Sequence, residues 1–273
     1  MENIETFLTR LNQRNKTFTP LIPPKQKAHE FIDNLIGFLF PISNKSHLSK
    51  DYYEVQFSEL KLEFKHLLIP ILACLKQKLN DSVERLFDKV PEIYDLLVLD
   101  AKSILKNDPA AGSMEEIIYA YPGFYAVAVH RVAHEIYLME IPILPRLISE
   151  YAHQKTGIDI HPGATIGKSF FIDHGTGIVI GETSIIGDNV KIYQGVTIGA
   201  LSVRKKDSRK KRHPSIENDV TIYSGTTILG GETTIGQGSV IGGNVWLTQS
   251  VPANSMVYHT SDVKVRPPKS EIL

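Results

Sequence analysis

Residues 160–199 read IHPGATIGKSFFIDHGTGIVIGETSIIGDNVKIYQGVTIG, and a similar pattern resumes over residues 216–247 as IENDVTIYSGTTILGGETTIGQGSVIGGNVWL. Isoleucine or leucine returns at nearly every sixth residue, frequently before glycine or a small polar residue. A period of six fits neither an amphipathic helix nor an alternating β-strand. It is typical of a parallel β-helix, in which each six-residue unit forms one side of a coil. The repeating positions are Ile160, Ile166, Ile172, Ile180, Ile186, Ile192, Ile198, Ile216, Ile222, Ile228, Ile235, Ile241 and Leu247.

The aliphatic residues of such coils point into a shared interior that no coil can bury alone. Glycine after the aliphatic residue suits a corner, where the backbone turns tightly and a side chain would obstruct it. The sequence therefore predicts a β-helix over residues 156–252, interrupted by a loop at 199–215, with residues 253–273 as a C-terminal tail.

Composition limits the class of protein. The chain has 273 residues, long enough for two domains. Its 30 basic and 30 acidic residues cancel, so no global field indicates nucleic acid or a membrane surface. The single cysteine, Cys74, excludes an intrachain disulfide and lies in an apolar run, which predicts an inert core residue. We find no secretory signal pattern and no run of membrane-spanning length, and we expect a cytoplasmic protein.

Residues 1–155 carry helical periodicity and no hexad repeat, and we expect them to form an α-helical oligomerisation domain. Asp81 is a good N-cap for a second helix, which Pro91 is predicted to break or kink. Two helix faces are marked by apolar residues at three- and four-residue steps: Phe57, Leu60, Phe64, Leu67 and Ile71, then Ala126, Val129, Ala133 and Ile136.

Three departures interrupt the hexads. Ile180 follows Ile172 by eight residues instead of six, and the interval includes the sequence DHGTG. The segment ALSVRKKDSRKKRHP follows Ile198 and must leave the coil as a loop. One extra residue lies between Ile228 and Ile235, which predicts a corner bulge at Gly230–Gly231.

The first departure contains His174, a residue type suited to general-base activation of a hydroxyl. Asp159 lies fifteen residues earlier, slightly less than one coil of roughly eighteen, so the two side chains can approach in adjacent coils. An aspartate bonded to one ring nitrogen fixes the histidine tautomer and stabilises the imidazolium. The alternative is a surface histidine beside a turn aspartate.

The second departure is a basic loop. Its cations could meet the phosphates of a nucleotide-bearing cofactor, or they could form a solvated loop. Arg212 and His213 stand where the loop rejoins the coil, and an ordered arginine there could bind a substrate carboxylate through two bonds. The other cations are Arg204, Lys205, Lys206, Arg209, Lys210 and Lys211, against the single acid Asp207.

The segments DIHPGATIG, IDHGTGIVIGET, YQGVTIG and RHPSI resemble the serine O-acetyltransferase branch of the hexapeptide-repeat acyltransferases. Upstream, NDPA and YPGFYAVAVHRVAH resemble the helical domain of the same family, so the likeness covers roughly residues 100–252. It implies a left-handed β-helix that transfers acetyl from acetyl-CoA to the L-serine hydroxyl, giving O-acetyl-L-serine and CoA for cysteine biosynthesis.

The resemblance also implies site residues. His174 would be the general base, oriented by Asp159, and serine would attack the thioester directly without an acyl-enzyme. Four residues would bind the ammonium and carboxylate groups of serine: Asp108, Asp173, Arg212 and His213. No metal is expected. Acetyl-CoA would lie between neighbouring β-helices of a homotrimer or hexamer, past Gly199, Ala200, Ser224, Gly225 and Gly243.

The chain departs from the family pattern in several places, among them the segment ANSMVYHTSDVKVRPP after Val251-Pro252, where the family often has a Gly-x-Pro-Ala-Arg-like segment. Ala200-Leu201-Ser202 stands where the family has a glycine-rich turn. The ending Glu271-Ile272-Leu273 is similar in character to a family tail that inserts into O-acetylserine sulfhydrylase, which is therefore a candidate partner.

Three alternatives remain. An acyltransferase for another hydroxyl acceptor would not need Asp108 and Asp173 to hold an ammonium group. A γ-type carbonic anhydrase would need three histidines around zinc, with His161, His174 and His213 as candidates. A non-catalytic scaffold would need none of these residues.

Overall fold

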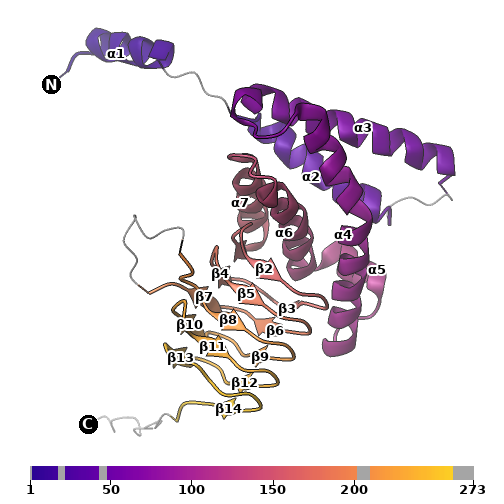
Figure 1. Cartoon of the computed structure of the whole chain (residues 1–273), viewed down its shortest axis with the longest axis vertical. Coiled ribbons are helices and arrows are strands. Elements are labelled where there is room, and N and C mark those ends of the chain that lie inside the picture. The colour runs from indigo at the N-terminus through magenta and orange to yellow at the C-terminus, as the bar shows by residue number, and fades with distance from the viewer. Residues whose placement is uncertain (1, 18–21, 43–47, 202–209, 261–273) are drawn as a thin grey trace, which may run out of the picture.

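The structure is a computed structural model that describes residues 2–17, 22–42, 48–201 and 210–260. A helical region comes first, and a solenoid of parallel strands follows it (Figure 1). This order confirms the predicted fold class. No helix of the described residues is long and apolar enough to cross a membrane.

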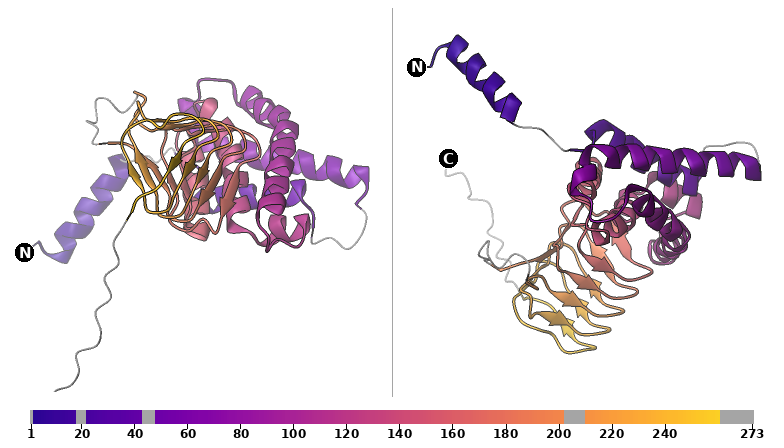
Figure 2. Two further views of the ribbon diagram at one scale, coloured as in Figure 1. Left: turned by 90° about the horizontal axis from the view of Figure 1, so that it is seen from below. Right: turned by 45° about the horizontal axis from the view of Figure 1, so that its top comes forward.

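The helical region contains seven described α-helices and one 3-10 helix. Helix α1 stands apart from the other helices in two views of the molecule (Figures 1 and 2). The last helix ends three residues before the first strand, close to the predicted domain boundary. The helices are α1 (Ile4–Thr17), α2 (Lys25–Leu39), α3 (Lys50–Leu68), η1 (Ile69–Cys74), α4 (Leu79–Asn107), α5 (Met114–Ala120), α6 (Pro122–Leu138) and α7 (Leu144–Thr156).

Three expectations about the helices need correction. The N-cap position of α4 is Lys78, without a side-chain hydrogen bond, and Asp81 lies in the first turn of the helix. Helix α4 continues through Pro91, so Pro91 does not break it. Cys74 is exposed at the end of η1 and does not belong to the core.

The strands form three parallel sheets, one for each side of a triangular coil. The chain visits the sheets in turn, so each corner lies between two particular sheets. The first sheet has β1 (Asp159–Ile160), β4 (Val179–Ile180), β7 (Thr197–Gly199), β10 (Thr227–Leu229) and β13 (Trp246–Leu247). The second has β2 (Thr165–Ile166), β5 (Ile185–Ile186), β8 (Ser215–Ile216) and β11 (Thr234–Ile235). The third has β3 (Phe171–Asp173), β6 (Lys191–Tyr193), β9 (Thr221–Ile222), β12 (Val240–Ile241) and β14 (Met256–Val257).

The hexad residues form the buried interior. Isoleucines stack in register along each sheet, as Ile160 does on Ile180 and Ile180 on Ile198. Almost all the predicted positions are buried, and Ile166 and Leu247 pack partly buried against the same cluster. Strand β14 pairs with β12, so the strands continue past the predicted end at residue 252.

The departures from the repeat change the length of each coil as predicted. Along the first sheet, β1 to β4 takes 20 residues (159 to 179) and β4 to β7 takes 18 (179 to 197). The basic loop lengthens the next coil to 30 (197 to 227), and the last interval takes 19 (227 to 246). The extra residue in that interval lies at a corner where Gly230 has a φ of +104°, which confirms the predicted bulge.

A buried ion pair joins the helices to the first coil. Arg131 of α6 donates from Nε and Nη2 to the Asp100 carboxylate of α4 at 2.6 and 2.8 Å. The same guanidinium donates to the carbonyl groups of Ile166 and Gly167, and the amide of Phe170 donates to Asp100 at 2.8 Å. Burial raises the pKa of Asp100, and the Arg131 charge opposes that rise. Both charges are therefore matched by several partners across the domain junction.

Candidate active site

His174 lies in the corner turn after β3, where the third sheet gives way to the first. Its backbone is left-handed, with a φ of 55°, which non-glycine residues adopt uncommonly and histidine more readily than most. Gly175 follows with a φ of +85°, and a Cβ there would lie 2.4 Å from Ile158 Cδ1. The amide of Gly177 donates to the Gly157 carbonyl at 2.8 Å. This glycine-rich turn therefore fixes the backbone and leaves the imidazole largely exposed, at 71% of its surface.

The carboxylate of Asp173 lies near His174, and Tyr121 and Tyr193 lie close enough to both Asp108 and Asp173 to sense the two charges. Asp173 Oδ1 is 3.6 Å from His174 Nδ1. Asp108, the C-cap of α4, accepts a hydrogen bond from Tyr121 Oη at 2.9 Å and from the Ala110 amide at 2.8 Å. The hydrogen bond to Asp108 raises the pKa of Tyr121 to about 12, and burial and the charge of Asp173 act in the same direction. Asp108 and Asp173 therefore share one neighbourhood beside an exposed imidazole.

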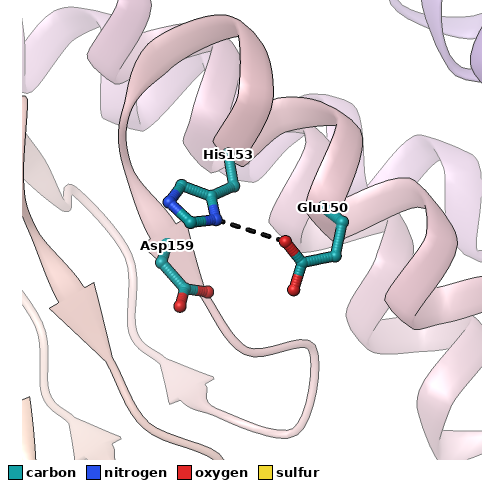
Figure 3. Close-up of side chains that lie close together, drawn as sticks. All are labelled: Glu150, His153 and Asp159. Atoms are coloured by element: carbon teal, nitrogen blue, oxygen red, sulfur yellow. Dashed lines mark hydrogen bonds and ion pairs between the residues drawn. The ribbon is translucent and has the colours of Figure 1, made fainter.

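The predicted contact between His174 and Asp159 does not form within one chain. Among the described residues no hydrogen bond or ion pair joins them. Asp159 opens β1 and lies beside Glu150 and His153 of α7 (Figure 3). The pairing of His174 with Asp159 therefore stays a prediction.

Arg212 and His213 occupy the corner between the first and second sheets, just before β8. The Arg212 guanidinium forms a short ion pair with Glu182, whose other oxygen accepts from Tyr137 Oη at 2.9 Å. Thr183 Oγ1 accepts from the amides of Arg212 and His213 at 2.9 and 3.1 Å. The end of the basic loop is thus fixed to the turn after β4.

The same contacts set the protonation of His213. Its Nδ1 accepts from the Thr183 amide at 3.0 Å, so the ring proton resides on Nε2. Burial and the neighbouring charges of Arg212 and Lys211 lower the pKa of His213 to about 4. A neutral His213 can therefore donate from Nε2 at neutral pH.

The basic loop lies partly outside the described residues, because residues 202–209 are not among them. Lys211 does not point to a free phosphate site: its Nζ donates to the carbonyl groups of Thr183 and Pro214 at 2.8 and 3.1 Å. Lys211 therefore stabilises the turn after β4.

The five predicted cofactor residues flank the first sheet on both sides. Gly199 ends β7, and Ala200 follows it. At the opposite corner the turns stack on the His174 turn, since the Gly195 amide donates to Thr176 and the Gly225 amide to Gln194. Ser224 and Gly243 belong to the same stack. Gly225 has a φ of +70°, and its Cβ would lie 2.3 Å from Asn244 Oδ1, so only glycine fits.

The predicted site residues therefore form two groups in one chain. One group, with Asp108, Asp173 and His174, lies at the corner between the third and first sheets. The other, with Arg212 and His213, lies at the corner between the first and second sheets. The width of the first sheet separates them.

Comparisons with known proteins identify the family. The plasmid serine acetyltransferase of Synechococcus elongatus is 51% identical over 190 residues, which make up 68% of this chain and 59% of that protein. Serine acetyltransferase of Bacillus subtilis is 46% identical over 164 residues, 60% of this chain and 73% of that protein. The chain belongs to the serine acetyltransferase family.

The solved structure of another serine acetyltransferase supports the same family assignment. Isoform 3 from Entamoeba histolytica, in complex with cysteine, matches with a TM-score of 0.77 at 33% identity, over 88% of this chain and 84% of that chain. No protein-family model matches the sequence. The resemblance inferred from the sequence motifs is confirmed.

The sequence did not lead us to predict the residues of this chain that hold the Arg212–His213 segment in place. Glu182 and Thr183 lie within the quoted segment IVIGET, so their proximity to a predicted corner was a usable signal. Tyr137 had none, because it lies on α6 and reaches the site only through the packing of the helices on the coils. Tyr121 lies between α5 and α6 and opens the quoted segment YPGFYAVAVHRVAH, so the resemblance was a usable signal for it.

The arrangement disfavours a carbonic anhydrase. His213 and His161 lie near Glu182, whereas His174 is at a different corner. Of the described residues, the one group of three side chains whose ligand atoms come within 4.8 Å of one another is Glu150, His153 and Asp159. The three candidate histidines do not form such a group.

Proposed function

We propose that this protein is a serine O-acetyltransferase, which transfers acetyl from acetyl-CoA to the L-serine hydroxyl. The observation that carries the proposal is the pair of carboxylates, Asp108 and Asp173, beside His174. An amino-acid substrate needs anions for its ammonium group, and a hydroxyl acceptor needs a base. A sugar acceptor would need the base alone.

In the proposed reaction His174 takes the proton from the serine hydroxyl through a ring nitrogen. The serine oxygen attacks the thioester carbonyl of acetyl-CoA and forms a tetrahedral oxyanion. When the intermediate collapses, the C–S bond breaks and the proton passes from His174 to the CoA sulfur. Arg212 binds the serine carboxylate, and neutral His213 donates from Nε2 to the substrate or the oxyanion.

We propose that a trimer completes the site. Both residue groups border the first sheet, at opposite edges of one chain. In a threefold assembly the His174 corner of one chain would face the Arg212 corner and Asp159 of its neighbour. Asp159 would then orient His174 across the interface, and acetyl-CoA would lie in the groove between two β-helices.

Further partners stay predictions. A hexamer made from two trimers would use the helical region. The tail at Ile272–Leu273, which would bind O-acetylserine sulfhydrylase, lies outside the described residues. The cytoplasmic location is likewise a prediction, from the single cysteine.

The activity is tested by measuring thiol release from acetyl-CoA with L-serine, L-homoserine, a galactoside and no acceptor. We expect release that depends on L-serine. Thiol release with one of the other acceptors but not with L-serine would show that the protein is an acyltransferase with a different substrate. Absence of release with all four would favour the non-catalytic scaffold.

The shared site predicts complementation between two inactive variants. His174→Ala and Arg212→Ala chains, co-expressed with different tags, should form mixed trimers in which some interfaces combine two intact halves. In a mixed trimer of either composition, one interface of the three combines two intact halves, so purified mixed trimers should recover about a third of the wild-type activity. The measurement is the activity of doubly purified mixed assemblies. Activity that stays at the level of the separate variants would place the whole site within one chain.

Thr183→Val predicts a selective loss of serine binding. Valine matches threonine in shape but removes the oxygen that accepts from the Arg212 and His213 amides, and an unmade buried hydrogen bond costs about 1–3 kcal/mol. We expect the KM for serine to rise about tenfold, while kcat changes less because no reacting atom is touched. Thr221→Val in β9 is the matched control. Equal KM values for the two variants would show that Thr183 does not position the pair.

A further inference from the structure

Three potential metal ligands converge where the last helix meets the first strand. Glu150 and His153 lie three residues apart on α7, so they share one face of the helix. Asp159 opens β1, and its carboxylate lies under the His153 ring (Figure 3). One ligand atom from each of the three residues lies within 4.8 Å of the others.

The connection between the helix and the strand is held by short hydrogen bonds. Gly157 ends α7 in the left-handed conformation, with a φ of 70°, and its amide donates to the His153 carbonyl at 2.8 Å. Thr156 Oγ1 donates to the Ala152 carbonyl at 2.7 Å and accepts from the Ile158 amide at 3.1 Å. The Asp159 amide donates into β4 at 2.9 Å. The backbones of the three residues are therefore fixed relative to one another.

The charges around the cluster suit a divalent cation. The Asp159 carboxylate follows the C-terminal end of α7, where the helix dipole is negative, and the Glu150 carboxylate lies in the middle of the helix. Within the cluster, Glu150 Oε2 is bonded to His153 Nδ1 at 3.2 Å. Its other oxygen, Oε1, pairs with Arg146 at 2.5 Å and so is engaged outside the cluster. One nitrogen and two carboxylate oxygens remain, with solvent access for a fourth ligand.

The donor set selects the metal. Imidazole with carboxylates favours zinc and similar transition ions over magnesium or calcium, which prefer oxygen alone. Bonds of about 2.0–2.2 Å place tetrahedral ligands roughly 3.3 Å apart. Side chains on a fixed backbone can close the remaining gap by rotation, since Glu150 and His153 are each nearly half exposed.

We propose that Glu150, His153 and Asp159 form a zinc site whose occupation ties Asp159 to the metal. The second part rests on the proposed function, in which Asp159 orients His174 of a neighbouring chain. A carboxylate bound to zinc is a weaker and reoriented acceptor for the imidazole N–H, because the cation takes up one oxygen and much of the negative charge, so the metal acts as an inhibitor of acetyl transfer. Dissociation of the metal frees Asp159 again.

The site is tested by direct binding. Full-length protein competes with a chromophoric chelator for Zn²⁺, and Co²⁺ serves as an absorbing substitute. His153→Ala and Glu150→Gln should each weaken Zn²⁺ binding by at least about tenfold, the scale on which loss of metal-site contacts acts. The controls are His66→Ala on α3 and Cys74→Ala, which remove another exposed histidine and the exposed thiol. Equal affinity for wild type and His153→Ala would overturn the site.

The activity arm separates the site from the proposed function. Zn²⁺ should inhibit the wild type and the His66→Ala control, and inhibition should be lost in His153→Ala at the same metal concentration. If Zn²⁺ binds tightly through His153 but does not change the activity, the zinc site is supported and the proposed role of Asp159 is refuted. If the protein shows no acetyl transfer at all, the proposed function fails, while the binding measurement still decides the metal site.

Discussion

His174→Ala is expected to lower kcat for acetyl transfer by about 10²–10⁴-fold, the contribution of a positioned general base. The turn around it should persist, because Gly175 and Gly177 provide two of its left-handed conformations and the ring is exposed, while alanine at the left-handed position 174 adds a cost of about 1 kcal/mol. The KM for serine should change little, since Asp108 and Asp173 are intact. Steady-state kinetics with L-serine and acetyl-CoA measure both constants.

His66→Ala provides the control for the loss of a histidine on the surface. Thermal unfolding of His66→Ala should match the wild type, and His174→Ala should unfold only a few degrees lower, because alanine adopts the left-handed backbone at position 174 less readily. A His174→Ala enzyme that keeps activity within about twofold would exclude proton transfer by His174, because such transfer contributes at least about 10²-fold. The proposed mechanism would then need another base.

Arg131→Met is expected to destabilise the protein by about 3–5 kcal/mol, because it leaves the Asp100 carboxylate buried without its counter-charge. The side chains of Arg131 and Asp100 are only 5% and 1% exposed, so water cannot replace the missing partner. The variant also loses the bonds to Ile166 and Gly167 that join the helices to the first coil. Denaturant unfolding followed by circular dichroism measures the change in free energy.

A double variant separates the charge from the packing. Asp100→Leu combined with Arg131→Met removes both charges and should recover much of the lost stability, since buried pairs are often replaceable by apolar side chains. The exposed pair Lys89–Glu92 provides the control, and Lys89→Met should leave the unfolding midpoint unchanged. A midpoint for Arg131→Met equal to that of Lys89→Met would show that the buried pair does not hold the junction.

A feature of this protein could be predicted from the sequence when the residues that produce it lie close together along the chain. The hexad places one aliphatic residue on each side of a coil, and this local period predicts the ladder that Ile160, Ile180 and Ile198 form. The departures from the period also predicted the longer intervals between paired strands. The family resemblance was carried by short contiguous segments such as IDHGTGIVIGET, and the comparisons confirm it.

Sequence reasoning was less reliable where a side chain meets a partner far along the chain. Asp159 was predicted beside His174 from a spacing of almost one coil. Within one chain Asp159 lies by Glu150 and His153 of α7, so its contact with His174 stays a prediction that needs a neighbouring chain. The burial of Cys74 was predicted from its apolar neighbours, but a short 3-10 helix exposes it.

The sequence by itself determined the β-helix, the position of its corners and the family, because each depends on residues that repeat or adjoin along the chain. Only the tertiary structure decided which side chains meet. The Asp100–Arg131 pair spans 31 residues and the Thr183–His213 contact spans 30, and neither leaves a periodic trace in the sequence. Hydrogen bonds and ion pairs need atoms within about 3 Å, and only packing of the helices on the coils provides that proximity.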